Sequence, residues 1–110
     1  MKLDFSEEVK ELIGKYEKEQ IKFAKNKEIL LKRIKASESE VKEEILGCEN
    51  LEYTEKQKKD NEARYVLFFV YSKKRGRIYV LTFSGSELII ITTFPMGRKT
   101  LIRYRKKRFK

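Results

Sequence analysis

Residues 64–94 read RYVLFFVY-SKKRG-RIYVLTF-SGS-ELIIITTF, which is three apolar stretches joined by two short polar connections. Val, Ile, Phe, Tyr and Thr dominate the apolar stretches, and these residue types favour β-strands. Connections of this length suit hairpins, so the sequence predicts an antiparallel meander of three strands: Arg64–Tyr71, Arg77–Phe83 and Glu87–Phe94. Nearly every strand position is apolar, so we expect helices to cover one face and the carboxy-terminal segment or a partner to cover the other.

The first 47 residues are predicted to be mainly helical. Either Asp4 or Ser6, followed by acidic residues, would cap the first turn. The pattern fits one long helix or two helices that break near residues 24–27. Large apolar side chains recur at helical spacing along roughly one face: Val9, Leu12, Ile13, Tyr16, Phe23, Leu30 and Ile34.

A separate short helix is predicted around Val41. Ser37 and Glu40 form a capping box, in which the serine side chain and the glutamate three residues later satisfy backbone amides of the first turn. The apolar residues continue to Leu46, and we expect Gly47 to close the helix because glycine adopts the left-handed conformation freely.

Residues 48–62 are predicted to be a linker or an edge strand. Leu51 and Tyr53 alternate as in a short strand, whereas Lys56–Asp60 resembles a loop. Pro95 is expected to end the third strand of the meander. The predicted fold is therefore α+β, with amino-terminal helices packed on a three- to four-stranded antiparallel meander in one domain: helices in 1–47, linker or edge strand in 48–62, sheet in 63–95 and a basic segment in 96–110.

Positive charge is concentrated in the second half of the chain. Residues 63–110 carry 13 Lys and Arg against one acid, Glu87, whereas the first 62 residues carry 14 basic and 16 acidic side chains. This distribution indicates a polyanionic partner such as RNA or DNA. The candidate nucleic-acid contacts are Arg64, Lys73, Lys74, Arg75, Lys99, Arg103, Arg105, Lys106, Lys107 and Arg108.

Missing residue types exclude several kinds of site. The chain has no histidine, the commonest general acid and base, and a single cysteine, Cys48, which we interpret as structural. Neither a cluster of metal ligands nor a glycine-rich phosphate loop is present, so no metal and no cofactor are expected.

Without a cleavable signal or an apolar run of ~20 residues, the protein is expected to be soluble and cytoplasmic. Its abundance of Lys, Glu and Ile suggests a thermophilic source.

Arginine, lysine and tyrosine suit one reaction, the metal-free cleavage of RNA by its own 2′-hydroxyl group. Arginine binds two phosphate oxygens at once and stabilises the charge that develops on them, and a tyrosine or lysine among cations has a lowered pKa. Arg77 starts a predicted strand, Arg98 follows the Gly97 turn, and Tyr104 lies six residues further on. These three residues are the catalytic candidates.

The arrangement resembles the RelE/ParE-type toxin superfamily, the messenger-RNA interferases of toxin–antitoxin pairs. Gly97-Arg98 followed by Tyr104 is similar to that family's glycine turn, catalytic arginine and later tyrosine, and Gly76-Arg77 is similar to its phosphate-binding arginine. The resemblance implies an endoribonuclease, an acidic antitoxin as partner, and RNA as substrate, either free or on the ribosome. The family's two lysines on the first meander strand are missing from residues 65–71.

Three hypotheses therefore remain open. The first is the toxin-type endoribonuclease. The second is a non-catalytic module that binds RNA or DNA with the same cations, which would neutralise phosphates without cleaving them. The third is a protein-interaction domain whose basic surface receives an acidic, partly disordered partner, and an antitoxin would be such a partner.

Overall fold

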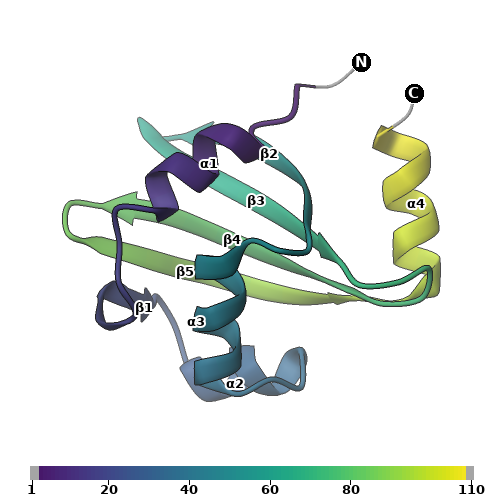
Figure 1. Ribbon diagram of the computed structural model, residues 1–110, viewed down its shortest axis with the longest axis horizontal. Coiled ribbons are helices and arrows are strands. Elements are labelled where there is room, and N and C mark those ends of the chain that lie inside the picture. Colours follow the sequence, from purple (N-terminus) through teal and green to yellow (C-terminus); the bar gives the residue numbers. More distant parts are fainter. Residues whose placement is uncertain (1–2, 109–110) are drawn as a thin grey trace.

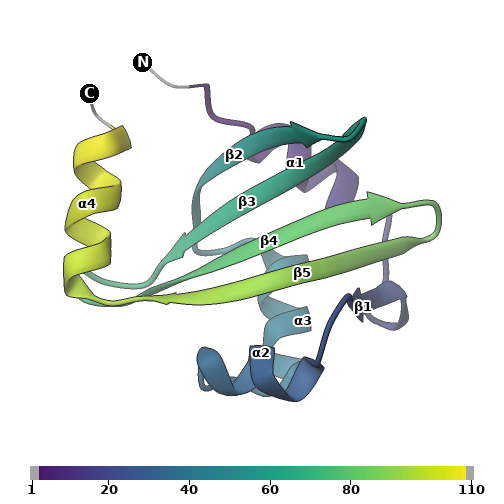
Figure 2. The ribbon, with the colours of Figure 1, turned by 180° about the vertical axis from the view of Figure 1, so that it is seen from behind.

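A computed structural model describes residues 3–108, with the side chains of Arg105, Lys107 and Arg108 left out. These residues form an α+β fold in which one five-stranded sheet has helices on both faces (Figures 1 and 2). The strand order in the sheet is β1-β5-β4-β3-β2. In chain order the elements are α1 (Ser6–Ile13), the 3₁₀ turn η1 (Lys18–Gln20), β1 (Ile21–Phe23), α2 (Lys27–Arg33), α3 (Glu38–Gly47), β2 (Leu51–Lys59), β3 (Glu62–Val70), β4 (Gly76–Ser84), β5 (Glu87–Met96) and α4 (Arg98–Arg108).

The predicted meander is present and has a fourth strand. β3, β4 and β5 pair antiparallel as expected, and β2 pairs antiparallel with β3 from Leu51 to Lys59. Residues 48–62 thus supply an edge strand, and the prediction of a loop over Lys56–Asp60 was wrong. Asp60 and Asn61 alone make the turn, with φ angles of 52° and 65°, because Asp and Asn tolerate the left-handed conformation of a two-residue hairpin.

The amino-terminal half departs further from the prediction. α1 ends at Ile13, and Ile21–Phe23 form β1, which pairs parallel with β5 from Leu88 to Ile90. A helix running through Phe23 was therefore wrong, and so was a wholly antiparallel sheet. The helical spacing of the apolar residues was misleading because Ile21 and Phe23 also alternate, as a strand requires.

One face of the sheet is covered by α1, α2 and α3 (Figure 1). Its main core, called here the helix-side cluster, joins apolar residues of α1 and α3 to the sheet residues beneath them. Full burial of each such side chain contributes about 1.5–3 kcal/mol. The cluster consists of Val9, Ile13, Ile21, Ile34, Val41, Ile45, Tyr65, Leu67, Phe69, Tyr79, Leu81, Leu88 and Ile90.

The opposite face is covered by α4, which crosses one end of the sheet (Figure 2). Leu101 and Tyr104 of α4 pack there against Tyr53, Val66, Phe68 and Met96, a set called here the α4-side cluster. The expectation that the carboxy-terminal segment covers the second face is thus confirmed for this end. No helix within residues 3–108 is long and apolar enough to span a bilayer.

The predicted capping box of α3 is half confirmed. The Glu40 amide donates to the Ser37 hydroxyl at 3.1 Å, so Ser37 is the amino-terminal cap. At the other end the prediction is one residue early, because Gly47 is still helical and Cys48 adopts the left-handed conformation, with φ of 53°. The Cys48 thiol donates to the Ile45 carbonyl at 3.0 Å, and burial raises the pKa of this thiol.

Candidate nucleic-acid interface

Strand pairing brings two basic turns together at one end of the sheet. Gly76, the first residue of β4, lies opposite Met96, the last residue of β5. The hairpin at residues 72–75 therefore lies beside Gly97 and the first turn of α4. Five of the cations that the sequence singled out are exposed there: Lys73, Lys74, Arg75, Arg98 and Lys99.

A cavity of about 530 Å³ opens at this end of the molecule, between the two turns and the end of α2. Cations from two separate segments of the chain, residues 33–35 and 74–77, line it, and none of the acidic side chains that the structure describes does. We call it the basic groove. Its lining residues are Arg33, Ile34, Lys35, Tyr71, Lys74, Arg75, Gly76, Arg77, Pro95, Met96 and Gly97.

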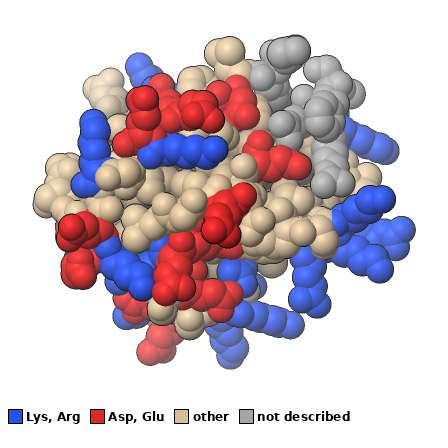
Figure 3. Space-filling view, in the orientation of Figure 1, with Lys and Arg blue, Asp and Glu red and all other residues tan. Residues whose placement is uncertain are grey.

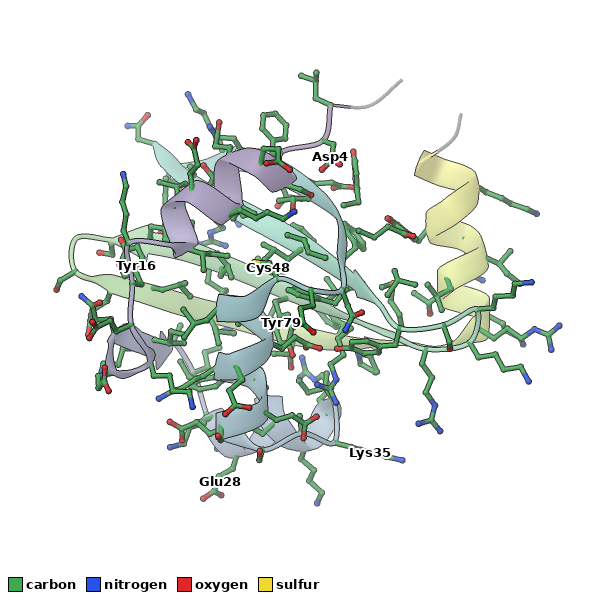
Figure 4. All side chains as sticks on the ribbon, in the orientation of Figure 1. Asp4, Tyr16, Glu28, Lys35, Cys48 and Tyr79 are labelled. Carbon is green, nitrogen blue, oxygen red and sulfur yellow. The ribbon has the colours of Figure 1, made fainter. Side chains whose placement is uncertain are left out.

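Sequence analysis missed Arg33 and Lys35, which lie in the half of the chain where basic and acidic side chains nearly balance. Arg33 ends α2, and its guanidinium donates to the Thr92 hydroxyl and the Thr93 carbonyl, both at 3.1 Å. Lys35 follows α2 in the left-handed conformation, with φ of 53°, and extends away from the body of the molecule (Figure 4). The signal was local: residues 29–37 contain three cations and no acid.

Arg77 faces the helices, on the side of the sheet that α3 covers. Its guanidinium donates to Glu40 at 2.8 Å and to Glu44 at 3.4 Å, and its side chain is 16% exposed. Burial lowers the pKa of Arg77, but the bond to Glu40 and the neighbouring tyrosines outweigh burial, so the pKa is raised. The residue predicted as a phosphate ligand therefore borders the groove already paired with two carboxylates.

Glu44 binds two tyrosines beside Arg77. The Tyr79 hydroxyl donates to Glu44 at 2.5 Å, and the Tyr71 hydroxyl donates to the other carboxylate oxygen. Tyr79 lies between the sheet and α3 (Figure 4). Burial first, and then the Glu44 carboxylate, raise the pKa of both hydroxyls, so neither tyrosine can serve as a base near neutral pH.

The three residues predicted to be catalytic do not converge. Arg98 is exposed at the start of α4, but Tyr104 is only 8% exposed and its ring stacks on Phe68, with centroids 4.7 Å apart. Tyr104 belongs to the α4-side cluster, whereas Arg77 contacts α3 across the sheet. Arg77 and Tyr104 thus lie on opposite faces.

The remaining predicted contacts have different positions. Arg64 lies on β3 opposite Thr82, far along the sheet from the 72–75 hairpin, and pairs with Glu62 at 3.4 Å. Arg103 and Lys106 are exposed on α4. The side chains of Arg105, Lys107 and Arg108 lie outside the described part of the structure.

The cations around the 72–75 hairpin and the first turn of α4 differ from those on the rest of the surface in their ion pairs. Four lysines packed near the helices are each held by a glutamate: Lys18, Lys27, Lys42 and Lys56. Figure 3 shows red and blue side chains mixed over α1 and α3, and blue ones gathered at the end with α4 and the hairpin. Within residues 3–108, seven cations there have no ion pair, and we call them the basic end: Arg33, Lys35, Lys73, Lys74, Arg75, Arg98 and Lys99.

The described residues contain no group of three or more His, Cys, Asp or Glu side chains placed to hold a metal ion. The described residues of the basic groove offer cations, backbone amides and the aromatic ring of Tyr71. Comparisons with family models, curated proteins and solved structures gave no significant match.

Proposed function

We propose that the protein is a non-catalytic module that binds RNA through phosphate contacts at the basic end. The observation that carries this proposal is the basic groove, where two segments distant in sequence, residues 33–35 and 74–77, supply five cations, of which only Arg77 has an ion pair within the described residues. Unpaired cations gathered at one place raise the local concentration of polyanions and release counterions when phosphates bind.

The absence of neighbouring acids matters energetically. A surface ion pair contributes only about 0–1 kcal/mol to stability. Pairing a surface lysine with a nearby glutamate therefore changes stability little, but it cancels the positive charge that the lysine presents to a ligand. The chain does this for Lys18, Lys27, Lys42 and Lys56 but leaves the basic end unpaired within residues 3–108. Arginine also offers a planar fork that fits phosphate oxygens, which suits Arg33 and Arg75 to this role.

Charge reversal in the groove tests the proposal. We expect Lys74→Glu with Arg75→Glu to weaken binding of a labelled RNA at least tenfold, measured by fluorescence anisotropy in about 0.1 M salt. The control is Lys58→Glu with Lys59→Glu, which makes the same change in net charge on exposed lysines next to the β2–β3 turn. Equal losses in the two double variants would contradict a defined interface.

The toxin-type endoribonuclease is a second candidate, and Arg98 is the observation that favours it. Arg98 is exposed at the first turn of α4, next to Gly97, which lines the groove. In that role it would stabilise charge on a phosphate during cleavage, and an acidic antitoxin would cover the basic end. Against this role, Tyr104 is buried and Arg77 is already paired.

Cleavage is tested with the wild type and Arg98→Ala. If the protein is an endoribonuclease, expression of the wild type degrades RNA and stops growth, and Arg98→Ala abolishes both effects while the thermal unfolding midpoint stays unchanged. Our first proposal instead expects intact RNA with either protein. Toxicity that persists in Arg98→Ala would remove the catalytic assignment.

A further inference from the structure

Two aromatic side chains, one in the basic groove and one next to it, are exposed. Tyr71 is 38% exposed and lines the groove, and Phe94 is 44% exposed and directly precedes Pro95, which also lines it. Within residues 3–108, every other aromatic side chain is buried or half-buried. Two rings exposed to water lack the favourable free energy that burial would give them. A ligand that covers both rings would supply this free energy.

An arginine guanidinium lies over each of the two exposed rings. The Arg33 guanidinium carbon lies 5.6 Å from the centroid of Phe94, and that of Arg77 lies 5.5 Å from the centroid of Tyr71. Both contacts fall within the range of cation–π attraction. The groove, at Tyr71, and the adjoining part of β5, at Phe94, thus offer two preformed surfaces of ring and guanidinium. Ring and guanidinium are the two kinds of planar group on which nucleic-acid bases stack.

Both arginines are held in position before any ligand arrives. Arg33 is fixed by Thr92 and Thr93 at the open side of β5, and Arg77 by Glu40 and Glu44 of α3. Side chains that are already ordered lose little conformational entropy on binding. Arg77 therefore has a use that does not require it to release its carboxylates: it orients Tyr71 while Lys74 and Arg75 meet the phosphates.

We propose that the ligand is single-stranded and that Phe94 and Tyr71 each stack on an unpaired base beside phosphates held by the groove cations. A duplex keeps the faces of its bases stacked inside, so exposed rings gain nothing from it, whereas a single strand presents both phosphates and open base faces. This inference rests on the nucleic-acid binding proposed above and adds the form of the ligand.

Three probes of equal length separate stacking from charge. A single-stranded 12-mer, its duplex and an abasic 12-mer carry phosphates in the same spacing per strand, and RNA and DNA versions of the first two compare the sugars. By anisotropy we expect the single strand to bind at least tenfold more tightly than the duplex or the abasic strand. Equal binding of all three would overturn the stacking proposal and leave phosphate binding intact, and no binding to any would overturn both.

Variants assign the stacking to a residue. Phe94→Ala is expected to weaken binding of the single strand about fivefold or more and to leave duplex binding unchanged. The control, Ile102→Ala, removes another exposed apolar side chain, which is 48% exposed on α4, and should change neither. Tyr71→Phe keeps the ring and should keep the affinity. A loss in Ile102→Ala equal to that in Phe94→Ala would overturn the assignment.

Phe94→Trp gives a direct signal because the chain contains no tryptophan. A base stacked on the indole quenches its fluorescence, so we expect quenching by the single strand and none by the abasic strand. Single-strand binding in this variant that raises anisotropy without quenching would show that position 94 does not stack and would overturn the proposal.

Discussion

Gly76 begins β4 at a point where neighbouring atoms leave no room for another carbon. A Cβ atom at this position would lie 2.6 Å from the Phe69 carbonyl oxygen and 2.8 Å from the end of the Met96 side chain. The methionine end can move, but the carbonyl belongs to the β3–β4 pairing and cannot. Glycine is therefore required here because β3 and Met96 of β5 leave no space for a side chain.

Gly76→Ala is predicted to destabilise the protein by about 2 kcal/mol or more, because overpacking a tight site forces the backbone to shift. The measurement is the urea midpoint of unfolding followed by circular dichroism. The matched control is Gly47→Ala at the end of α3, where no atom lies within 4 Å of the added carbon. Alanine there should leave stability unchanged or raise it by up to about 1 kcal/mol. Similar midpoints for wild type and Gly76→Ala would contradict the packing argument.

At the scale of elements, Glu38 connects α2 to α3. It starts α3, where an acid suits the helix dipole, and it pairs with Lys27 of α2 at 2.7 Å and with Lys42 at 2.8 Å. The hydrogen bonds from Lys27 and then from Lys42 lower the pKa of Glu38 to about 2. The two lysines thus stabilise the charged Glu38 carboxylate in the folded state, and this stabilisation is missing in the unfolded chain.

This pKa gives stability a defined pH dependence. The contribution of Glu38 is fully present above its ordinary pKa of 4.5 and is lost as the pH falls towards about 2. Glu38→Gln should therefore lower the free energy of unfolding at pH 7 by about 0.5 kcal/mol, a value reduced by the exposure of the pair, and should match wild type near pH 2. Urea unfolding across this pH range checks it, with Glu11→Gln on exposed α1 as control. A difference that persists unchanged at pH 2 would contradict the ion-pair explanation.

The two edge strands of the sheet, β2 and β1, are protected against pairing with other strands in different ways. β2 carries Lys56, Lys58 and Lys59, and the Phe5 amide donates to the Thr54 carbonyl at 3.0 Å, so the amino-terminal segment occupies part of that edge. β1 pairs with β5 only as far as Ile90, and beyond it Pro95 and the Arg33 hydrogen bonds cover the edge. Lysine, proline and side-chain covering are common protections against unwanted strand addition.

For the whole molecule, the separation of charge predicts a steep dependence of binding on salt. The seven unpaired cations of the basic end can each neutralise a phosphate, and a single strand loses about 0.7 log units of affinity per contact for each log unit of salt. We expect a slope of roughly −3 to −5 for single-stranded RNA between about 50 and 200 mM salt. Titration by anisotropy measures it, and a slope near −1 would mean that few of these cations touch phosphate.

The sequence predicts the meander well, offers β2 only as a linker or a short edge strand, and does not predict β1. The three central strands follow from β-branched and aromatic residues between short turns, which are local signals. β2 is rich in lysine and becomes a strand because β3 supplies its hydrogen bonds, and β1 has only Ile21, Lys22 and Phe23, too few residues for a periodic pattern. Both strands depend on tertiary pairing that overrides local preference.

The candidate site is predictable in part for a similar reason. Lys74, Arg75 and Arg98 stand in turns next to strand ends, so strand pairing brings them together. The side of the sheet on which Arg77 lies could also have been predicted from the sequence. Arg77 is two residues from Tyr79 on the same strand, so the two side chains point to the same face. Arg33 and Lys35 could not be placed, since nothing local shows that α2 ends beside β5.

The parallel pairing of β1 with β5 joins two segments that are far apart in the sequence. Neighbouring meander strands can join through short loops, whereas Ile21 must wait for Leu88, which is most of the chain away. The adjacent contacts, from Tyr16 to the Gly85 carbonyl and from Gln20 to the Ser86 carbonyl, connect the same distant segments at the surface. We therefore expect β1, although it is the first of the described strands in chain order, to join the sheet last and its amides to exchange before those of the meander, as hydrogen exchange would measure.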